Sequence, residues 1–259
     1  MAALPGAWTR RRWFGAREFA DYDRCPFAYR LRHVADFPDP LPSFDDRSRG
    51  RLRHSPRRGR VAHAALERLD FQRGAAGVEE AVAFALAQEP ALTPDEADDL
   101  RAWLTPRIAA FLDTPVAAGI QSAPETKREL PFTLRVGTAY VRGTIDILWR
   151  DAAGEWHLAD YKTDEVEADG VARRAAGSAL QVQVYALAAR ALAGRPPADA
   201  ALFYVIPQVA HSVAIDAAAL DGAQSRLADA IARIRAGEFP RHRHAGCEWC
   251  AYRRFCSDA

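Results

Sequence analysis

The sequence predicts an α/β fold, a mixed β-sheet flanked by helices, built as one domain from residues 1–259. A chain of this length can bury one sizeable core. Two apolar, β-branched runs around a short turn predict a β-hairpin over residues 141–163. Helical spacing of apolar residues recurs on both sides of this hairpin and predicts helices over 61–71, 78–88, 93–111, 178–192 and 220–236. Further strands are expected over 129–136, 200–206 and 212–215.

The composition is that of an ordinary globular protein. Hydrophobic residues make up 49% of the chain and charged residues 27%, and the formal net charge is only +1. No apolar run reaches the length that a membrane span needs, so we expect a cytoplasmic protein without a membrane partner. The phosphate-binding motif G-x-x-x-x-G-K-[S/T] is absent, so we expect no nucleotide cofactor. Any unwinding of nucleic acid would then come from a partner protein.

The N-terminal region, residues 14–34, carries aromatic and aliphatic side chains at helix-like intervals. Cys25 and Pro26 interrupt the pattern, which predicts two short helices that meet at the cysteine. The aromatic side chains are expected in the core rather than on a base-stacking surface. Residues 38–42 are rich in proline and predict a loop over or beside the functional site.

An arginine-rich stretch precedes the helix of residues 61–71 and contains Arg49, Arg51, Arg53, His54, Arg57, Arg58 and Arg60. Such a run is typical of a segment that contacts nucleic-acid phosphates, and Arg57 and Arg58 are the candidates for contact with DNA. A disordered, arginine-rich insertion would explain the same run, because charge runs are often merely solvated.

In the helix predicted over 61–71, His63 lies off the apolar stripe and shares a face with Glu67. A lone histidine in this position is usually a surface residue. The following helices carry no motif, and the second is opened by Thr93 as an N-cap before an acidic first turn. We therefore interpret residues 75–120 or so as a helical insertion.

The hairpin over 141–163 brings charged residues together. Asp151 and Gly154 supply the turn chemistry between its strands. Side chains alternate along a strand, so Asp160 and Lys162 leave the second strand on one face. Asp146 lies near the middle of the partner strand and should come within a residue or so of Asp160. Two carboxylates and an ammonium group are therefore expected to converge.

This trio has a chemical use, because carboxylate oxygens hold Mg²⁺ or Mn²⁺ and a lysine can orient water or stabilise charge on a phosphate. A solvated cross-strand ion pair would show the same spacing. Among the 35 basic residues only Lys127 and Lys162 are lysines, which favours a specific need for an ammonium at Lys162. Glu129 is a further carboxylate at the edge of the site and ranks below the others.

The pattern resembles that of the PD-(D/E)-x-K nuclease superfamily, in its RecB-like branch. Four motifs of that branch have counterparts here in the right order: Gly59-Arg-Val-Ala-His63, Gly143-Thr-Ile-Asp146, Asp160-Tyr-Lys162 and Gln181-Val-Gln-Val-Tyr185. Any one of these motifs alone would be weak, whereas four in order are specific. The resemblance implies a restriction-endonuclease-like fold and metal-dependent cleavage of DNA, with exonuclease activity in recombination, repair or CRISPR adaptation.

The resemblance also implies roles for these residues. Mg²⁺ or Mn²⁺ would be held by His63, Asp146, Asp160 and the backbone carbonyl of Tyr161. Lys162 would position the attacking water. Gln181 and Tyr185 would lie near the nucleic-acid backbone. Two alternatives remain open: a nuclease subunit that is active only with a helicase partner, and a noncatalytic iron-sulfur module that binds DNA. The intact Asp146, Asp160 and Lys162 argue against the second.

The four cysteines of the chain form a C-x2-C-x5-C cluster, Cys247, Cys250 and Cys256, with Cys25 left over. Cysteines of an intracellular chain more often bind metal or catalyse than form disulfides, and four thiolates suffice for one metal centre. Chemistry alone leaves zinc and iron-sulfur open. The arrangement resembles that of AddB-like and CRISPR-adaptation nucleases, which favours a [4Fe-4S] cluster, with Zn²⁺ as the alternative. Residues 240–259 would then close onto Cys25.

Overall fold

The computed structural model of the chain describes residues 6–37, 56–90 and 92–256. The loop expected over 38–42 and the arginine-rich residues 49–54 lie outside the described residues. Among the described residues, no helix combines the length and the apolar character needed to cross a membrane.

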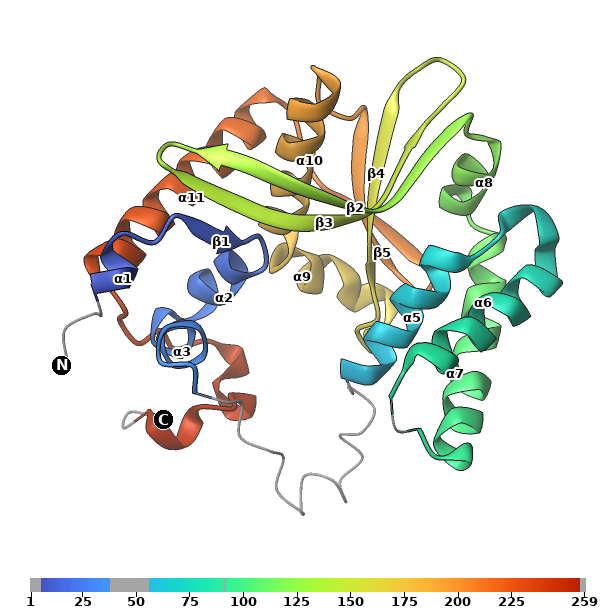
Figure 1. Cartoon of the computed structure of the whole chain (residues 1–259), viewed down its shortest axis with the longest axis horizontal. Coiled ribbons are helices and arrows are strands. Elements are labelled where there is room, and N and C mark those ends of the chain that lie inside the picture. Colours follow the sequence, from blue (N-terminus) through green and yellow to red (C-terminus); the bar gives the residue numbers. More distant parts are fainter. Residues whose placement is uncertain (1–5, 38–55, 91, 257–259) are drawn as a thin grey trace.

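A six-stranded mixed sheet forms the centre of the protein (Figure 1). Its main order is β1-β3-β4-β5-β6, and β2 pairs with the other edge of β3. Strands β1 and β3 are parallel, as are β4 and β5, and the remaining pairs are antiparallel. The strands are β1 (Trp13–Gly15), β2 (Glu125–Val136), β3 (Ala139–Arg150), β4 (Trp156–Lys162), β5 (Asp199–Tyr204) and β6 (Val209–Ser212).

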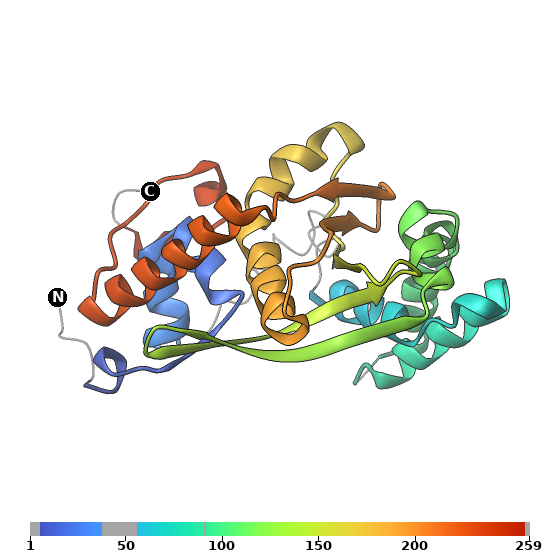
Figure 2. The same ribbon diagram turned by 90° about the horizontal axis from the view of Figure 1, so that it is seen from above.

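Helices flank this sheet, with α10 and α11 beside one part of it and α5–α8 beside the other (Figures 1 and 2). The α-helices are α1 (Gly6–Thr9), α2 (Glu18–Arg24), α3 (Pro26–Tyr29), α5 (Pro56–Arg68), α6 (Gly74–Gln88), α7 (Pro94–Leu112), α8 (Pro115–Ser122), α9 (Val171–Ala176), α10 (Ala179–Ala193) and α11 (Ala217–Ala236). A π-helical turn, Arg30–Val34, continues α3. The predicted fold class, a mixed sheet flanked by helices, is confirmed.

Most predicted elements are present, and the differences have local causes. Thr93 caps α7 through a capping box with Glu96, as expected from its sequence. The strand expected over 212–215 instead occupies residues 209–212. It starts earlier because the turn after β5 is tight, with Gln208 at a φ of 56°. Strand β1 and helices α8 and α9 were not predicted, because each is too short to show a period.

Strand β3 has a fork along one edge. Its first part pairs with β1 at residues 140–142, and its last part pairs with β4 at residues 147–150. Between these two ladders, the Asp146 side chain takes over a hydrogen bond that a strand would otherwise make, because its Oδ2 accepts the backbone N–H of Tyr161 at 2.8 Å. Gly143 is required in this stretch, since a Cβ there would lie 2.8 Å from the Phe132 ring.

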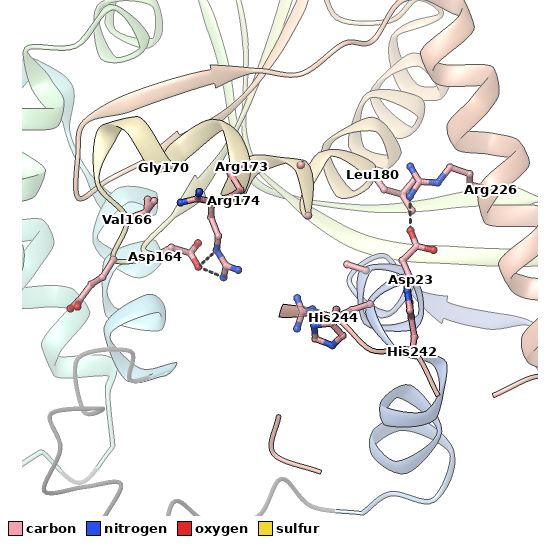
Figure 3. A pocket seen from close by; sticks show the side chains of 15 residues that line it. Asp23, Asp164, Val166, Gly170, Arg173, Arg174, Leu180, Arg226, His242 and His244 are labelled. Carbon is pink, nitrogen blue, oxygen red and sulfur yellow. Dashed lines mark hydrogen bonds and ion pairs between the residues drawn. The ribbon is translucent and has the colours of Figure 1, made fainter. Parts of the chain in front are cut away.

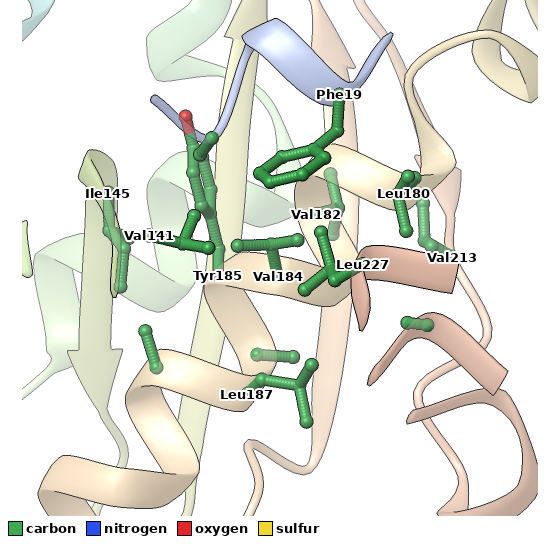
Figure 4. Close-up of a cluster of buried hydrophobic side chains, with 14 of the residues drawn as sticks. Phe19, Val141, Ile145, Leu180, Val182, Val184, Tyr185, Leu187, Val213 and Leu227 are labelled. Carbon is green, nitrogen blue, oxygen red and sulfur yellow. The ribbon is translucent and has the colours of Figure 1, made fainter. Parts of the chain in front are cut away.

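The side-chain alternation along β3 changes phase at Asp146. In a regular strand Ile145 and Ile147 would share a face. Here Ile145 packs into a core with α10 and α11, whereas Ile147 packs into a second core with α5–α8. Glu129 is opposite Asp146 on β2 and has a φ of 43°, in the left-handed region. This distortion of the paired strands lets one hairpin serve two cores (the first is drawn in Figure 4).

The two described ends of the chain lie against each other (Figures 1 and 2). The segment after α11 packs on α2 and α3, with the Tyr22 and Phe239 rings 6.4 Å apart. Three hydrogen bonds join the ends: Tyr22 hydroxyl to Glu238 carbonyl at 2.7 Å, Phe27 N–H to Pro240 carbonyl at 3.1 Å, and Tyr252 hydroxyl to Phe37 carbonyl at 3.1 Å.

Candidate functional site

A cavity of about 820 Å³ opens beside the fork in β3. Side chains reach it from several elements: Arg17 before α2, His63 from α5, Glu129 from β2, Lys162 at the end of β4 and Gln181 from α10. These residues are far apart in the sequence, so the cavity depends on the whole fold. We call it the catalytic cavity.

His63, Glu129 and Asp146 form one group of metal-binding side chains. A nitrogen or oxygen atom from each lies within 4.8 Å of those of the other two, and no other such group of three is present among the described residues. His63 Nδ1 lies 3.5 Å from Asp146 Oδ2 and 3.9 Å from Glu129 Oε1. One imidazole and two carboxylates suit Mg²⁺ or Mn²⁺.

Glu129 reaches this group through its unusual backbone. A residue other than glycine with φ near 43° costs on the order of 1 kcal/mol, and such strain is concentrated at functional sites. From its sequence position, Glu129 ranks below the other acidic residues of the site. The structure corrects this ranking, because the turn of the backbone at Glu129 directs its carboxylate toward His63 and Asp146, which a period-two pattern along the strand does not reveal.

Asp160, Lys162 and Gln181 form a second group in the same region. The Lys162 Nζ lies 2.8 Å from Asp160 Oδ2 and donates to Gln181 Oε1 at 2.9 Å. The Gln181 Nε2 donates to Asp160 Oδ1 at 2.9 Å and to the Tyr185 hydroxyl at 2.7 Å. Asp160 and Gln181 are buried, and the amide of Gln181 thereby fixes the lysine and the carboxylate at once.

The charge of Asp160 is balanced within the site. Its Oδ2 is fully buried and, within the described residues, accepts no hydrogen bond of suitable geometry, but the Lys162 ammonium lies 2.8 Å away and forms an ion pair with it. The donor set of His63, Glu129 and Asp146 by itself fits a divalent metal ion.

The electrostatics of the metal-binding group agree with this interpretation. Burial and the neighbouring charge of Asp160 raise the pKa of Asp146 above its ordinary value. Burial lowers the pKa of His63, but Glu129, Asp146 and Asp160 outweigh burial and raise it. Two crowded carboxylates beside a histidine are the arrangement that a divalent cation would relieve by displacing protons.

Metal stabilisation should therefore depend on pH. The raised pKa values of Asp146 and His63 give stability that is present at low pH and lost as the pH rises through the folded-state values. Metal needs both groups deprotonated, so Mn²⁺ should raise the melting temperature more at about pH 8 than at about pH 6. Scanning fluorimetry with Mn²⁺ or chelator measures this. The Asp146→Asn variant should lose most of the effect, and equal shifts at both pH values would contradict it.

Arg17 is a site residue that the sequence pattern does not reveal. It lies close to the Tyr185 hydroxyl and to the carboxylates of Asp146 and Asp160. Burial lowers the pKa of Arg17, but the neighbouring Tyr185, Asp146 and Asp160 outweigh burial and raise it. Arg17 follows β1, and since that three-residue strand gives no sequence signal, nothing in the sequence places Arg17 beside the carboxylates. It adds positive charge opposite Lys162 in the catalytic cavity.

The other predicted contact residues lie in varied surroundings. Tyr185 is only 1% exposed, and both it and Gln181 belong to the hydrogen-bond network described above. Arg58 lines the catalytic cavity and pairs with Glu165 at 3.0 Å, whereas Arg57 pairs with Glu89 and Glu96. Contact of these four residues with DNA stays a prediction, as does coordination by Asp160 and by the carbonyl of Tyr161.

The four cysteines line a second, smaller cavity of about 360 Å³. Cys25 comes from the junction of α2 and α3, and Cys247, Cys250 and Cys256 come from the C-terminal segment. All four are unpaired and partly buried. The backbone N–H of His244 donates to the Cys247 sulfur at 3.3 Å. Sequence spacing therefore anticipated which residues share this cavity.

A family model described as the PD-(D/E)XK nuclease superfamily matches residues 15–257. The chain belongs to this superfamily. The matched range spans β1 to the cysteine segment and includes both the catalytic cavity and the four cysteines. Membership establishes a nuclease family, whereas the preference for DNA, the metal and the roles of single residues are taken up below as proposals.

Curated relatives of this PD-(D/E)XK chain are large proteins named as ATP-dependent helicase/nuclease subunits. The one from Carboxydothermus hydrogenoformans is 32% identical over 162 residues, which are 57% of this chain and 14% of the relative. That from Heliobacterium modesticaldum is 30% identical over 129 residues, 41% of this chain and 8% of the relative. The chain thus spans only a small part of these relatives.

One solved structure supports the PD-(D/E)XK fold. A crystal structure titled as a candidate exonuclease from Eubacterium rectale covers 97% of this chain and 93% of its own, with a TM-score of 0.54 and 13% sequence identity. At this identity the likeness concerns the fold alone. The AddB-like cysteine pattern expected from the sequence is not confirmed by these relatives, whose names do not include AddB.

Proposed function

We propose that this chain is a divalent-metal-dependent deoxyribonuclease that hydrolyses phosphodiester bonds, acting as an exonuclease in recombination, repair or CRISPR adaptation. The observation that carries this proposal is the meeting of two groups in the catalytic cavity: the metal-binding group of His63, Glu129 and Asp146, and the ammonium of Lys162 held by Asp160 and Gln181. Membership in the PD-(D/E)XK superfamily supports it.

His63, Asp146, Asp160 and the carbonyl of Tyr161 would hold Mg²⁺ or Mn²⁺, and we add Glu129 to this set. When bound, the metal would supply Lewis-acid stabilisation of negative charge on the scissile phosphate. The chain's own residues arrange the reaction around it. Lys162 is fixed at its ammonium by Asp160 and Gln181, so it can hold a water molecule in line with the phosphorus.

Arg17 and Gln181 have supporting roles in this proposal. The Gln181 amide bridges Lys162 and Asp160, so it sets the distance between the group that orients water and the carboxylate beside the metal. The Arg17 guanidinium faces both carboxylates and can donate to phosphate oxygens once their charge is compensated. Preorganised charge of this kind is worth on the order of 10²-fold or more in rate per group.

A second candidate is a nuclease unit that is active only within a helicase complex. The names of the curated relatives favour it, because each is a helicase/nuclease subunit of which this chain matches a small part. This candidate predicts weak cleavage by the isolated chain and stimulation by a partner helicase. A noncatalytic DNA-binding module is disfavoured by the intact Asp146, Asp160 and Lys162.

We also propose that Cys25, Cys247, Cys250 and Cys256 bind one metal centre, a [4Fe-4S] cluster with Zn²⁺ as the alternative. Four thiols around one cavity suit either centre. Tetrahedral zinc would bring the sulfurs to about 3.8 Å from one another, given zinc–sulfur bonds of about 2.3 Å. In a [4Fe-4S] cluster each thiolate would bind its own iron, so iron and zinc analysis decides between the two centres.

One assay tests the activity. End-labelled linear DNA and closed circular DNA, each single- and double-stranded, are incubated with the protein and Mg²⁺, Mn²⁺ or chelator. Exonuclease action should degrade the linear substrates, spare the circles and stop with chelator. Cleavage of circles would replace the exonuclease assignment by an endonuclease. Metal-independent cleavage would contradict the proposed mechanism, and cleavage seen only with a helicase present would favour the second candidate.

A further inference from the structure

A third cavity, of about 810 Å³, adjoins the catalytic cavity (Figure 3). Its walls come from α2, α9, α11, the segment after β4 and the C-terminal segment. In Figure 3 the side chains of Arg173 and Arg174 from α9 lie across from His242 and His244 of the C-terminal segment. We call this space the adjoining cavity.

The adjoining and catalytic cavities share part of their walls. Arg24, Arg174 and Asp164 line both of them, as do Ala20 and Gly177. A chain-like ligand bound at the fork in β3 would therefore extend past these residues into the adjoining cavity. Arg174 is held at this boundary by an ion pair with Asp164.

Arginines outnumber carboxylates in the lining of the adjoining cavity. Four guanidinium groups and two imidazoles face three carboxylates, of which Glu165 is already paired with Arg58 outside the cavity. Arg173 makes no ion pair within the described residues, and Arg226 pairs with Asp23 at 2.5 Å. Burial, and then the charges of Arg24 and His242, lower the pKa of His244, as expected where cations crowd.

We propose that the adjoining cavity binds the phosphates of one strand of nucleic acid, next to the scissile bond. This inference rests on the proposed nuclease function and deepens it by naming the form of the substrate. Arginine guanidinium groups bind phosphates through bidentate hydrogen bonds. None of the lining residues is a phenylalanine, tyrosine or tryptophan on which a base could stack. Binding there is therefore independent of base sequence.

The dimensions select a single strand. A space of about 810 Å³ is that of a site for a compact ligand, which admits a few nucleotides of one strand. We expect a B-form duplex to be excluded, because its major groove alone is about 12 Å wide, which is more than a site of this volume accommodates. A duplex substrate would have to be separated before reaching the site.

Equilibrium binding in chelator tests this inference without cleavage. Fluorescence anisotropy compares the wild-type protein with the double variant Arg173→Gln/Arg226→Gln on labelled oligothymidylates of about three and about ten nucleotides. We expect the variant to bind the longer strand at least tenfold more weakly. Each lost phosphate contact should also reduce the salt slope of log affinity by about 0.7. The short strand can bind in either cavity, because the two have nearly equal volumes, so the longer strand carries the comparison.

A matched double variant, Arg73→Gln/Arg195→Gln, removes the same charge from ion pairs on other surfaces and should bind like the wild type. The inference is overturned if Arg173→Gln/Arg226→Gln keeps the wild-type affinity and salt slope for the longer strand. It is also overturned if the variant loses affinity equally for a blunt duplex of matched length. Because no cleavage is measured, a protein without nuclease activity can still pass this test, so the two proposals fail separately.

Discussion

Lys162→Ala is expected to lower the rate of DNA cleavage by about 100-fold or more. The ammonium of Lys162 is held by both Asp160 and the amide of Gln181, and alanine leaves no group there to orient water. The loss should appear in the single-turnover rate at saturating protein and Mg²⁺, because binding of the DNA strand uses other residues. Gel analysis of end-labelled single-stranded DNA measures this rate.

Asp160→Asn tests the same site by changing the ion-pair partner of Lys162. The side chain keeps its shape, so the protein should fold, but the carboxylate that pairs with Lys162 loses its charge. Cleavage should fall by a similar factor, and the metal requirement should move to higher concentrations. Lys127→Ala is the matched control, since Lys127 is the other lysine of the chain and forms an exposed ion pair with Glu125. Wild-type cleavage by either site variant would refute the site assignment.

The stability of the lysine variant needs a separate measurement. Asp160 is buried, and removal of its cationic neighbour leaves that charge uncompensated in the metal-free protein. Such a change costs on the order of 3 kcal/mol. The double variant Asp160→Asn/Lys162→Ala removes both charges and should recover part of the loss in a denaturant titration. A rate loss that persists in the stable double variant is therefore due to chemistry rather than unfolding.

Cys25→Ser is expected to destabilise the whole protein, although Cys25 lies outside the catalytic cavity. A metal centre shared by Cys25 and the C-terminal cysteines would close a loop of more than two hundred residues, since Cys247 is the next ligand along the chain. Restricting the unfolded chain in this way is worth on the order of 5 kcal/mol. Serine at any of the four positions should thus lower the melting temperature of the anaerobically purified protein, and lower nuclease activity indirectly.

Metal analysis separates the outcomes for the cysteines. A [4Fe-4S] cluster predicts brown protein with about four irons per chain. Colourless protein with stoichiometric zinc would keep the shared centre and exclude the cluster. Protein without bound metal and with four titratable thiols would exclude both. Tyr252→Phe serves as the control, because Tyr252 lies in the same segment as three of the cysteines and the change spares every thiol. It removes one hydrogen bond to the Phe37 carbonyl, so the free energy of unfolding should fall by about 1 kcal/mol.

The sequence predicted those parts of the site that depend on local pattern. The hairpin follows from β-branched runs around Asp151 and Gly154, whereas its register is given by the structure, which pairs Ile147 with Ala159 and places Asp146 beside Asp160. His63 lies on the predicted helix and reaches the carboxylates. The spacing of the cysteines likewise predicted that they lie together, and the structure places all four around one cavity. Such a prediction needs only the positions of the cysteines along the chain and no knowledge of the fold.

The remaining site residues depend on contacts that no local pattern encodes. Glu129 enters the metal-binding group only because its backbone adopts a left-handed conformation in the middle of a strand. Arg17 reaches the carboxylates because β1 pairs with β3, from more than a hundred residues away along the chain. Gln181 was expected near the nucleic-acid backbone, and its bonds to Lys162 and Asp160 became visible only with α10 in place.

The change of phase in β3 has a mechanical consequence. His63 is fixed by the core that contains α5–α8, whereas Gln181 is fixed by the core that contains α10 and α11. Both cores are packed against the same strands, β3, β4 and β5, so the distance between the imidazole and the amide-held lysine is set by how each helical layer packs on the sheet. A substitution that shifts α5 or α10 on the sheet should therefore change this distance even if it lies far from the carboxylates. The distance between these two groups is thus a natural control point for turning the site on or off.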